Sequence, residues 1–505
     1  MRLSSGLAFR GSVALAVVAM GVCVAFGQLT PLTPNDPFYG DNQTFPGGQY
    51  WLRLTRTNYA WSIVGYALGP QSVSTSPDRT IAVIDTGTDP DHPDFIIDPV
   101  MIPPHIFHYD SGSVLDGAIA PPFGCGCHPD AIPTSEVEDL LWLGNGLPSG
   151  EPHGTVETGL LCAVADNSVG MAGVCWDCSL LVERVATAQA SGACQPGQVL
   201  TCYSADENVA AALRWAAGYD FVLESYPSDS VRARVVNTAT ETLYAQQRWC
   251  DANNPLKLAI EEATDRGCII VAIAGNDQTG PLDRGPMTAG LAIHPHTITV
   301  GGCDRNGVWS MPISQSNPEC TTLCNPECTA LYPDLSTHVD PCNGLTYVKA
   351  LSVVAPIEDI FSTYYIHPAN NNIEYDYMGA DGTSWAAPQV AGVVALMLKV
   401  NPDLTPEMCK KIIEVTATDL TTEGGLYPGY DRFTGYGLLN AEKAVTMAAK
   451  LYHPGDWNLD GSVGPLDAVL YTADFVALEA TSDLNLSESL TTDDMGIFLG
   501  SYAGE

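Results

Sequence analysis

The sequence is short of positive charge. Its 505 residues include 21 Lys and Arg against 58 Asp and Glu, which gives a formal net charge of −37. A protein that binds DNA or RNA needs excess cationic side chains to displace the counterions of the phosphate backbone. The composition therefore argues against nucleic acid as a partner.

Long apolar runs are also scarce. The one such run, residues 11–26, follows Arg2 and Arg10 and ends in Ala25-Phe26-Gly27 before Gln28. This pattern is typical of a signal peptide, predicted here as residues 1–27, and it predicts a secreted, extracellular protein. The alternative is a membrane anchor, but a span takes about 20 apolar residues. We expect no membrane span after signal removal.

Apolar and aromatic residues are plentiful, and they exclude a disordered chain. Hydrophobic residues make up 46% and charged residues 16%, with 9 Trp and 21 Tyr. Of the 16 Cys, Cys23 lies in the signal, so 15 remain and disulfides are expected in an exported protein. Plausible local pairs are Cys125/Cys127, Cys175/Cys178 and Cys194/Cys202. For Cys320, Cys324, Cys328 and Cys342, disulfides are favoured over a zinc site.

Short apolar runs alternate with helical patterns from about residue 80. Strands are expected at 80–84, 180–185, 234–237, 268–274, 297–300 and 350–355, and helices at 153–164, 208–217, 257–266, 384–400, 406–415 and 440–450. This alternation predicts an α/β fold with a parallel sheet covered by helices on both faces. In such folds ligands bind beyond the carboxyl ends of the strands.

The chain divides by composition. Two stretches rich in Pro, Gly, Asn and Cys, near 101–147 and 310–347, are predicted to be surface insertions held by disulfides. After residue 451, residues 452–505 contain 10 Asp and Glu and no Lys or Arg. The predicted organisation is a signal (1–27), a main domain (28–451) and an acidic module (452–505).

Four polar residues lie at the predicted strand ends and helix starts. Asp85 ends an apolar strand, His153 and Ser384 each open a helix, and Asn276 follows a buried strand. A serine hydroxyl needs a base to become a nucleophile, His suits that role near neutral pH, and a buried Asp fixes its tautomer. An Asn amide can donate to an oxyanion. Each residue alone is more often a cap or a turn former, but all four together indicate acyl transfer.

The segments around these residues resemble the subtilisin-like serine proteases, or subtilases, over about residues 35–450. The matching segments are Ile84-Asp85-Thr86-Gly87, His153-Gly154-Thr155, Ala274-Gly275-Asn276 and Gly382-Thr383-Ser384-Trp385-Ala386-Ala387-Pro388. The resemblance implies the subtilisin-like fold, a triad of Asp85, His153 and Ser384, and an oxyanion hole containing Asn276. It also implies peptide-bond hydrolysis on protein or peptide substrates.

The chain departs from the family pattern in two places. Val156 and Glu157 follow His153-Gly154-Thr155 where the family usually has another His and a small residue. Thr238-Ala239-Thr240-Glu241 replaces the usual Ser- and Gly-rich pocket segment, so the sequence does not indicate which substrate residues are preferred.

The resemblance also implies structural calcium. Asp36, Asp94, Asp166 and Asn167 match ligand positions of thermitase-like members, and hard oxygen ligands suit Ca²⁺. The alternative is a set of solvated loop acids and turn formers.

Residues 456–467 fit a twelve-residue calcium loop. Asp456, Asn458, Asp460 and Asp467 occupy ligand positions 1, 3, 5 and 12, Gly461 occupies the turn position, and Ser462 after it is a further predicted ligand. A second copy begins 27 residues later, where Asp483, Asn485, Ser487 and Asp494 repeat positions 1, 3, 5 and 12, but Glu488 replaces its turn glycine. Pro454 and Gly455 separate the first loop from any preceding helix, and a helix is expected at 465–478.

A calcium loop with only an exiting helix, present twice, resembles a dockerin module. The resemblance implies a small α-helical module that docks to a cohesin-type partner; an acidic solvated tail is the alternative. The leading prediction is thus a secreted serine endopeptidase with a dockerin-like appendage. The competing readings are a narrow-specificity processing protease and a non-catalytic binding protein that keeps the fold.

Overall fold

The computed structural model describes the greater part of the predicted main domain and nearly all of the acidic module. The described residues are 29–66 (except 42 and 45), 68, 80–85, 88, 92–95, 106–107, 153–184, 187–188, 202–203, 206–219, 225, 232–239, 254–276, 290–309, 337–339, 346–366, 374–420, 429–431, 433–487 and 489–504. The predicted signal peptide and most of both predicted insertions lie outside these residues.

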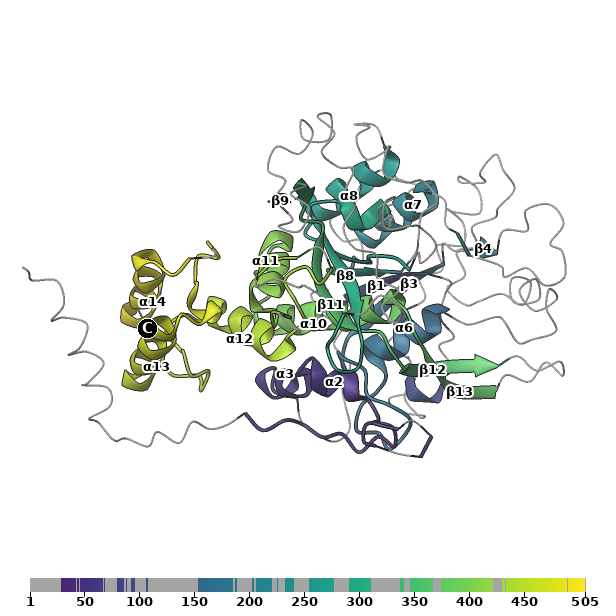
Figure 1. Ribbon diagram of the computed structural model, residues 1–505, viewed down its shortest axis with the longest axis horizontal. Coiled ribbons are helices and arrows are strands. Elements are labelled where there is room, and N and C mark those ends of the chain that lie inside the picture. The colour runs from purple at the N-terminus through teal and green to yellow at the C-terminus, as the bar shows by residue number, and fades with distance from the viewer. Residues whose placement is uncertain are drawn as a thin grey trace, which may run out of the picture.

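A seven-stranded parallel sheet forms the centre of the main domain (Figure 1). The strand order is β11-β8-β7-β6-β1-β3-β2. Its strands are β1 (Thr80–Asp85), β2 (Ile106–Phe107), β3 (Ser179–Arg184), β6 (Val235–Thr238), β7 (Ile269–Ile273), β8 (Thr297–Cys303) and β11 (Leu351–Pro356). Chain order reverses direction beside β1, so β1 flanks the point where ligands of open α/β sheets bind.

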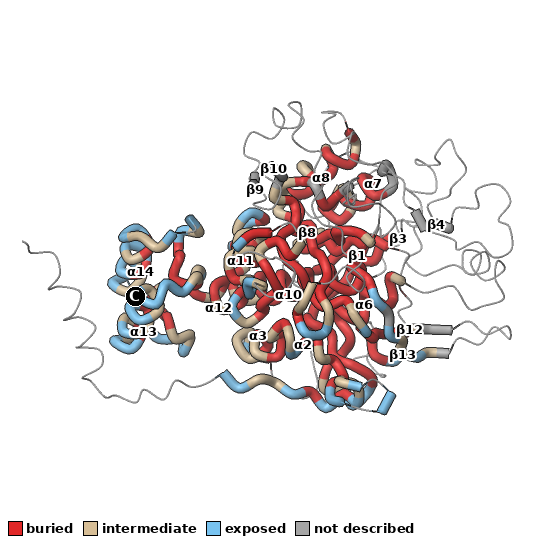
Figure 2. Tube along the Cα trace, viewed as in Figure 1, coloured by how far each residue is buried: buried red, intermediate tan, exposed pale blue. Residues whose placement is uncertain are grey.

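Helices cover both faces of this sheet, as predicted. In β1, Ile81 and Val83 face one apolar cluster while Ala82 and Ile84 face the other, because successive side chains of a strand point to opposite faces. Helices α7 (Asp206–Ala216) and α8 (Pro255–Asp265) cover the second face, and α6 (His153–Cys162), α10 (Ala386–Val400), α11 (Pro406–Thr416) and α12 (Ala441–Tyr452) lie on the first. Figure 2 shows the buried core running through both layers.

Local capping explains where several helices begin. The side chain of Asn254 accepts the backbone N–H groups of Leu256 and Lys257 at the start of α8, and Thr405 and Asn440 cap α11 and α12 in the same way. Pro255 and Pro406 follow their caps at a position where a missing N–H is harmless.

Some elements were not predicted. Two short helices, α2 (Tyr50–Leu54) and α3 (Thr57–Ile63), lie near the N-terminus, and an antiparallel hairpin of β12 (Ile360–Ile366) and β13 (Glu374–Ala380) separates β11 from Ser384. The α-helix predicted to open at Ser384 begins at Ala386, after the 3-10 turn η4 (Thr383–Trp385). The remaining short elements are η2 (Pro93–Phe95), β4 (Thr187–Ala188), β5 (Cys202–Tyr203), η3 (Gly290–Ile293), β9 (Thr337–Val339) and β10 (Thr346–Val348).

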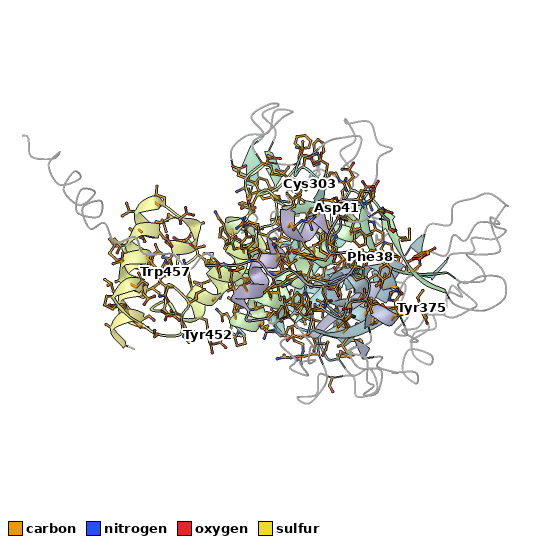
Figure 3. All side chains as sticks on the ribbon, turned by 90° about the horizontal axis from the view of Figure 1, so that it is seen from below. Phe38, Asp41, Cys303, Tyr375, Tyr452 and Trp457 are labelled. Atoms are coloured by element: carbon orange, nitrogen blue, oxygen red, sulfur yellow. A yellow bond between two sulfur atoms is a disulfide. The ribbon has the colours of Figure 1, made fainter. Side chains whose placement is uncertain are left out.

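The acidic segment forms a small helical module. Helices α13 (Pro465–Ala477) and α14 (Thr492–Gly504), with the turn η5 (Ala480–Ser482), pack around Trp457, Tyr471, Leu484 and Phe498. Trp457 lies inside this module (Figure 3). The rings of Tyr471 and Phe498 stack with centroids 4.0 Å apart and an interplanar angle of 2°.

The module is joined to α12 through a buried lysine. The Nζ of Lys450 lies 3.7 Å above the Trp457 ring and donates to Asp474 Oδ2 at 3.3 Å, and Trp457 Nε1 donates to the same oxygen at 2.8 Å. Burial lowers the pKa of Lys450 to about 8. Lys450 therefore links the end of the main domain to the core of the module.

Cysteines and apolar helices can be assessed only in the described part. Cys175 is bonded to Cys178, one of the predicted local pairs, while Cys162, Cys268, Cys303 and Cys409 are buried. Cys125, Cys127, Cys194 and the Cys320–Cys342 group lie outside the described residues. One described helical stretch, Thr383–Val400, is apolar enough to cross a membrane, but 89% of it is buried in the domain interior, as in a core helix.

Candidate active site

Asp85 and His153 form a hydrogen-bonded pair at the carboxyl end of the sheet. The Nδ1 of His153, the first residue of α6, lies 2.9 Å and 3.0 Å from the two carboxylate oxygens of Asp85, the last residue of β1. The Asp85 side chain is buried, whereas that of His153 is 25% exposed. This arrangement fixes the imidazole through Nδ1 and leaves Nε2 as the nitrogen for proton transfer.

Ser384 lies in the turn η4, beside the first turn of α6. The ring of the next residue, Trp385, lies 5.0 Å from the His153 ring, centroid to centroid. Gly382, immediately before η4, has a φ of 144°. Residues with a side chain rarely adopt this angle, so glycine is needed where the chain enters the turn. Ser384 is 7% exposed.

Asn276, three residues after β7, is held by the residue before Ser384. Its Oδ1 accepts the backbone N–H of Thr383 at 2.9 Å and the Thr383 hydroxyl at 2.8 Å. With the carbonyl end engaged in this way, the NH₂ end of the amide faces away from Thr383. Sequence reasoning did not identify this function of Thr383, although Thr383 lies within the quoted serine motif.

Glu157 is a second carboxyl behind the pair. It lies one helical turn after His153, is completely buried, and places Oε1 3.6 Å from His153 Nδ1. Its Oε2 accepts from Asn237 Nδ2 of β6 at 2.8 Å. Burial, together with the charge of Asp85, raises the pKa of Glu157 well above its ordinary value. The sequence marked Glu157 only as a departure from the family pattern.

The predicted ligands Asp36, Asp94, Asp166 and Asn167 are brought together. Asp36 accepts the backbone N–H of Asp166 at 2.8 Å and of Asn167 at 3.1 Å, and Asn167 Nδ2 donates to Asp94 Oδ1 at 3.3 Å. Gly170 allows a close approach here, since a Cβ at this position would overlap the Tyr377 hydroxyl and Asp94 Oδ2. Segments distant in sequence thus converge on one acidic cluster.

Burial shapes the electrostatics of that cluster. It raises the pKa of Asp36 to about 6 and that of Asp94 well above its ordinary value, and the charge of Asp36 raises the Asp94 pKa further. The donor set is carboxylate and amide oxygen, the chemistry that Ca²⁺ prefers. The residues therefore fit calcium by ligand type.

The two predicted loops of the module have matching hydrogen bonds. Asp467 Oδ1 accepts the N–H of Asn458 at 2.9 Å, and Asp494 Oδ1 accepts the N–H of Asn485 at 3.1 Å. Asp456 Oδ1 accepts the N–H of Asp460 as Asp483 Oδ1 accepts that of Ser487, and Ser462 donates to Asp460 Oδ1. Leu459 and Leu486, both at the fourth position, have φ of 58° and 56°. The described parts of both loops therefore share one backbone shape, while Glu488 lies outside them.

The predicted calcium ligands lie near one another, but no three of their described carboxylates place ligand oxygens within 4.8 Å of one another. Within the described ranges, two groups bring three His, Cys, Asp or Glu ligand atoms within 4.8 Å of one another: Asp85-His153-Glu157 and Cys175-Asp177-Cys178. In the predicted calcium sites, the carboxylates instead accept the N–H groups given above. An ion would replace some of these hydrogen bonds.

Known proteins match this chain over most of its length. A family model described as "Subtilase family" matches residues 77–437. An "Extracellular protease" of Xanthomonas campestris pv. campestris is 25% identical over 422 residues, which is 83% of this chain and 57% of that protein. A "Thermophilic serine proteinase" of a Bacillus species is 25% identical over 82% of this chain and 69% of its own length, and "Fervidolysin" of Fervidobacterium pennivorans is 27% identical over 82% and 48%. The chain thus spans about half to two thirds of these relatives.

A solved structure has a fold similar to that of this chain, which supports the predicted parallel sheet with helices. The structure is described as "Proteases from Pseudoalteromonas arctica PAMC 21717". It superposes on this chain with a TM-score of 0.50 at 21% sequence identity, and the superposition covers 83% of this chain and all of the solved chain. At this identity the likeness concerns the fold alone.

Proposed function

Because this chain belongs to the subtilase family, we propose that it is a serine endopeptidase that hydrolyses protein or peptide substrates outside the cell. The observation that supports this proposal most directly is the Asp85–His153 hydrogen bond at 2.9 Å, beside the turn that carries Ser384. Secretion through a signal at residues 1–27, and the boundary at 451, are parts of the same proposal. Intact residues at all four positions favour an enzyme over a non-catalytic binding protein.

The proposed reaction uses each group in a separate role. His153 Nε2 takes the proton of the Ser384 hydroxyl as Oγ attacks the peptide carbonyl, and Asp85 stabilises the imidazolium that forms. The Asn276 NH₂ donates to the oxyanion of the tetrahedral intermediate. His153 then gives its proton to the leaving amine, and water hydrolyses the acyl-enzyme by the same steps.

Covalent labelling tests the nucleophile. A serine-directed fluorophosphonate is expected to label the full-length chain stoichiometrically, and Ser384→Ala should abolish that label because Oγ is the bonded atom. Ser352→Ala is a matched control, since Ser352 is buried away from His153 and donates to Glu414 at 3.0 Å. Equal labelling of wild type and Ser384→Ala would show that another residue is the nucleophile.

Calcium is proposed as a structural ion at two places. Asp36, Asp94, Asp166 and Asn167 would hold it in the main domain; the two repeated loops would hold it in the module through Asp456, Asn458, Asp460, Ser462 and Asp467, and through Asp483, Asn485 and Asp494. A bound cation supplies charge that neutralises clustered carboxylates. The supporting observations are the convergence of distant segments and the oxygen-only donor sets.

The module is proposed to be dockerin-like and to dock a cohesin-type domain. Six of the ten large apolar side chains that are exposed among the described residues lie on its helices: Leu466, Val469, Val476 and Leu478 on and after α13, and Ile497 and Leu499 on α14. Val469 is 56% exposed and Val476 71%. This surface suits a protein partner rather than solvent.

Substitution of that surface tests the partner. We expect Val469→Asp to weaken calcium-dependent binding to a cohesin-type domain at least about tenfold, because a charge would be buried at the contact. Leu68→Asp is the matched control, since Leu68 is a similarly exposed apolar residue of the main domain. Titration calorimetry gives the dissociation constants. If Val469→Asp bound as tightly as wild type, the contact would lie elsewhere.

A further inference from the structure

The structure assigns a specific task to Glu157, resting on the proposed function of the same site. We propose that Glu157 is a positioning residue that carries a proton beside the His153–Asp85 pair, so that the Nδ1 side of the imidazole faces one negative charge rather than two. Through Asn237, the same carboxyl ties the first turn of α6 to β6. Four observations on the contacts and burial of Glu157 support this.

The first observation is the distance between Glu157 and the imidazole. Residues four apart lie on one face of a helix, so α6 presents His153 and Glu157 to the same side. The 3.6 Å between His153 Nδ1 and Glu157 Oε1 is too long for a hydrogen bond but close enough for strong electrostatic coupling. Because Asp85 already accepts from Nδ1, Glu157 does not compete for that proton.

The second observation is the anchor on the opposite side. Asn237 lies on β6 in register with Val83 of β1, two residues before Asp85. Its Nδ2 donates to Glu157 Oε2 at 2.8 Å, which fixes the carboxyl and directs Oε1 toward the pair. The contact therefore joins α6 to the sheet close to the carboxyl ends of β1 and β6, where Asp85 lies.

The third observation is that Oε1 is fully buried and makes no hydrogen bond in the described structure. An ionised oxygen in that setting would carry an uncompensated buried charge, which is among the most costly features in a protein interior. Ligand atoms of Glu157 and Asp85 lie inside one 4.8 Å group, so an ionised Glu157 would also be repelled by the charge of Asp85. Asp85 has the imidazole as its partner, so the proton resides on Glu157.

The fourth observation concerns the charges around Glu157. The one charge that acts on it appreciably is that of Asp85, from β1. On its own helix it faces His153, and β6 contributes the neutral amide of Asn237. Strand β12 contacts α6 through the hydroxyls of Ser362 and Thr363, which donate to backbone carbonyls of the first turn of α6. No described lysine or arginine is present to stabilise an ionised Glu157.

Two consequences follow for catalysis. A second full charge near Nδ1 would make the imidazole more basic, so His153 would stay protonated, and useless as a base, to higher pH. A neutral acid avoids this while still filling the space and holding Asn237. Removing the side chain would loosen the ring, and misplacement of a catalytic group by about 1 Å can cost about 10²-fold in rate.

Infrared difference spectroscopy tests the charge state. With the full chain in the Ser384→Ala background, which prevents self-digestion, the spectrum at pH 7 is compared before and after Glu157→Gln. We expect the loss of one protonated-carboxyl C=O band. Loss of an ionised-carboxylate band instead would overturn the proposal. This measurement is independent of hydrolysis, so it stands even if the proposed function fails.

Kinetics test the positioning role with a matched control. Glu157→Gln should keep the acid-limb pKa of kcat/KM and hold kcat within about threefold, whereas Glu157→Leu should lower kcat at least about tenfold with little change in KM. Glu183→Leu is the control: Glu183 is also a buried carboxyl, but it pairs with Ile84 and faces the opposite side of the sheet. A fall in the acid-limb pKa by more than one unit in Glu157→Gln, or equal effects of Glu157→Leu and Glu183→Leu, would contradict the inference.

Discussion

Ser384→Ala is expected to lower kcat by about 10⁶-fold, His153→Ala by a similar factor, and the double variant by no more than either alone. The reason is that nucleophile and base act as one unit: without His153 the Ser384 hydroxyl keeps its proton, and without Ser384 the imidazole has no proton to accept. Asp85→Asn should cost less than either, about 10⁴-fold, because the imidazole remains in place with the wrong tautomer. Steady-state hydrolysis of a chromogenic peptide gives these factors.

A separate variant, Asn276→Leu, tests the oxyanion donor. Asn276→Leu alone should lower kcat by about 10²–10³-fold with little change in KM, since the oxyanion exists only in the transition state. Asn401→Leu is the control: Asn401 is also buried, but it follows the C-terminal end of α10, away from Ser384, and its Nδ2 donates to Ala448 O at 3.0 Å. Additive losses for Ser384→Ala and His153→Ala would mean that the two residues do not act on the same proton.

Removal of calcium is expected to cost about 4 kcal/mol of unfolding free energy if the ion is present at about 1,000 times its dissociation constant. The ion binds the folded chain, where distant loops converge, and not the unfolded chain. Thermal unfolding with calcium and with a chelator, followed by calorimetry, measures the change. We expect separate losses for main domain and module if the two unfold separately.

Substitutions separate the calcium site of the main domain from those of the module. Asp94→Asn should remove most of the calcium dependence of the main domain, and Asp494→Asn should weaken the second loop of the module. Each has a matched exposed control, Asp265→Asn in the main domain and Asp493→Asn beside Asp494. If the chelator left both transitions unchanged, the carboxylates would be solely partners of backbone N–H groups.

The sequence predicted the parallel sheet because its strands are continuous apolar runs. All six predicted strands and the main helices are present, with each end within three residues of its predicted position. The start of α10 was placed two residues early, because sequence alone does not separate the 3-10 turn at Ser384 from the helix that follows it. Asp85 and Asn276 lie at the carboxyl end of the sheet because they follow parallel strands. The start of α6 with His153 and the turn with Ser384 lie at the same end.

Other features gave weak or misleading signals. Strands β12 and β13 are rich in Tyr, Thr and acidic residues, so a search for apolar runs passes over them. The hydrogen bonds from Thr383 to Asn276 depend on a turn that brings the two residues together. The hydrogen bond between Glu157 and Asn237 joins residues that are 80 apart in sequence. A lone Glu in an apolar helix gives no sign of its partner until the fold is known.

The attachment of the module bears on how the proposed active site would be oriented. The connection from α12 to the first loop is only residues 453–455, and Lys450, Trp457 and Asp474 fasten the two parts together. Leu486 of the second loop also packs against the core of the main domain. A long flexible linker between the main domain and the module would let the main domain reach substrates in many directions around a bound module. Here, a partner bound to the module would also fix the distance to the main domain and the direction that the carboxyl end of its sheet faces.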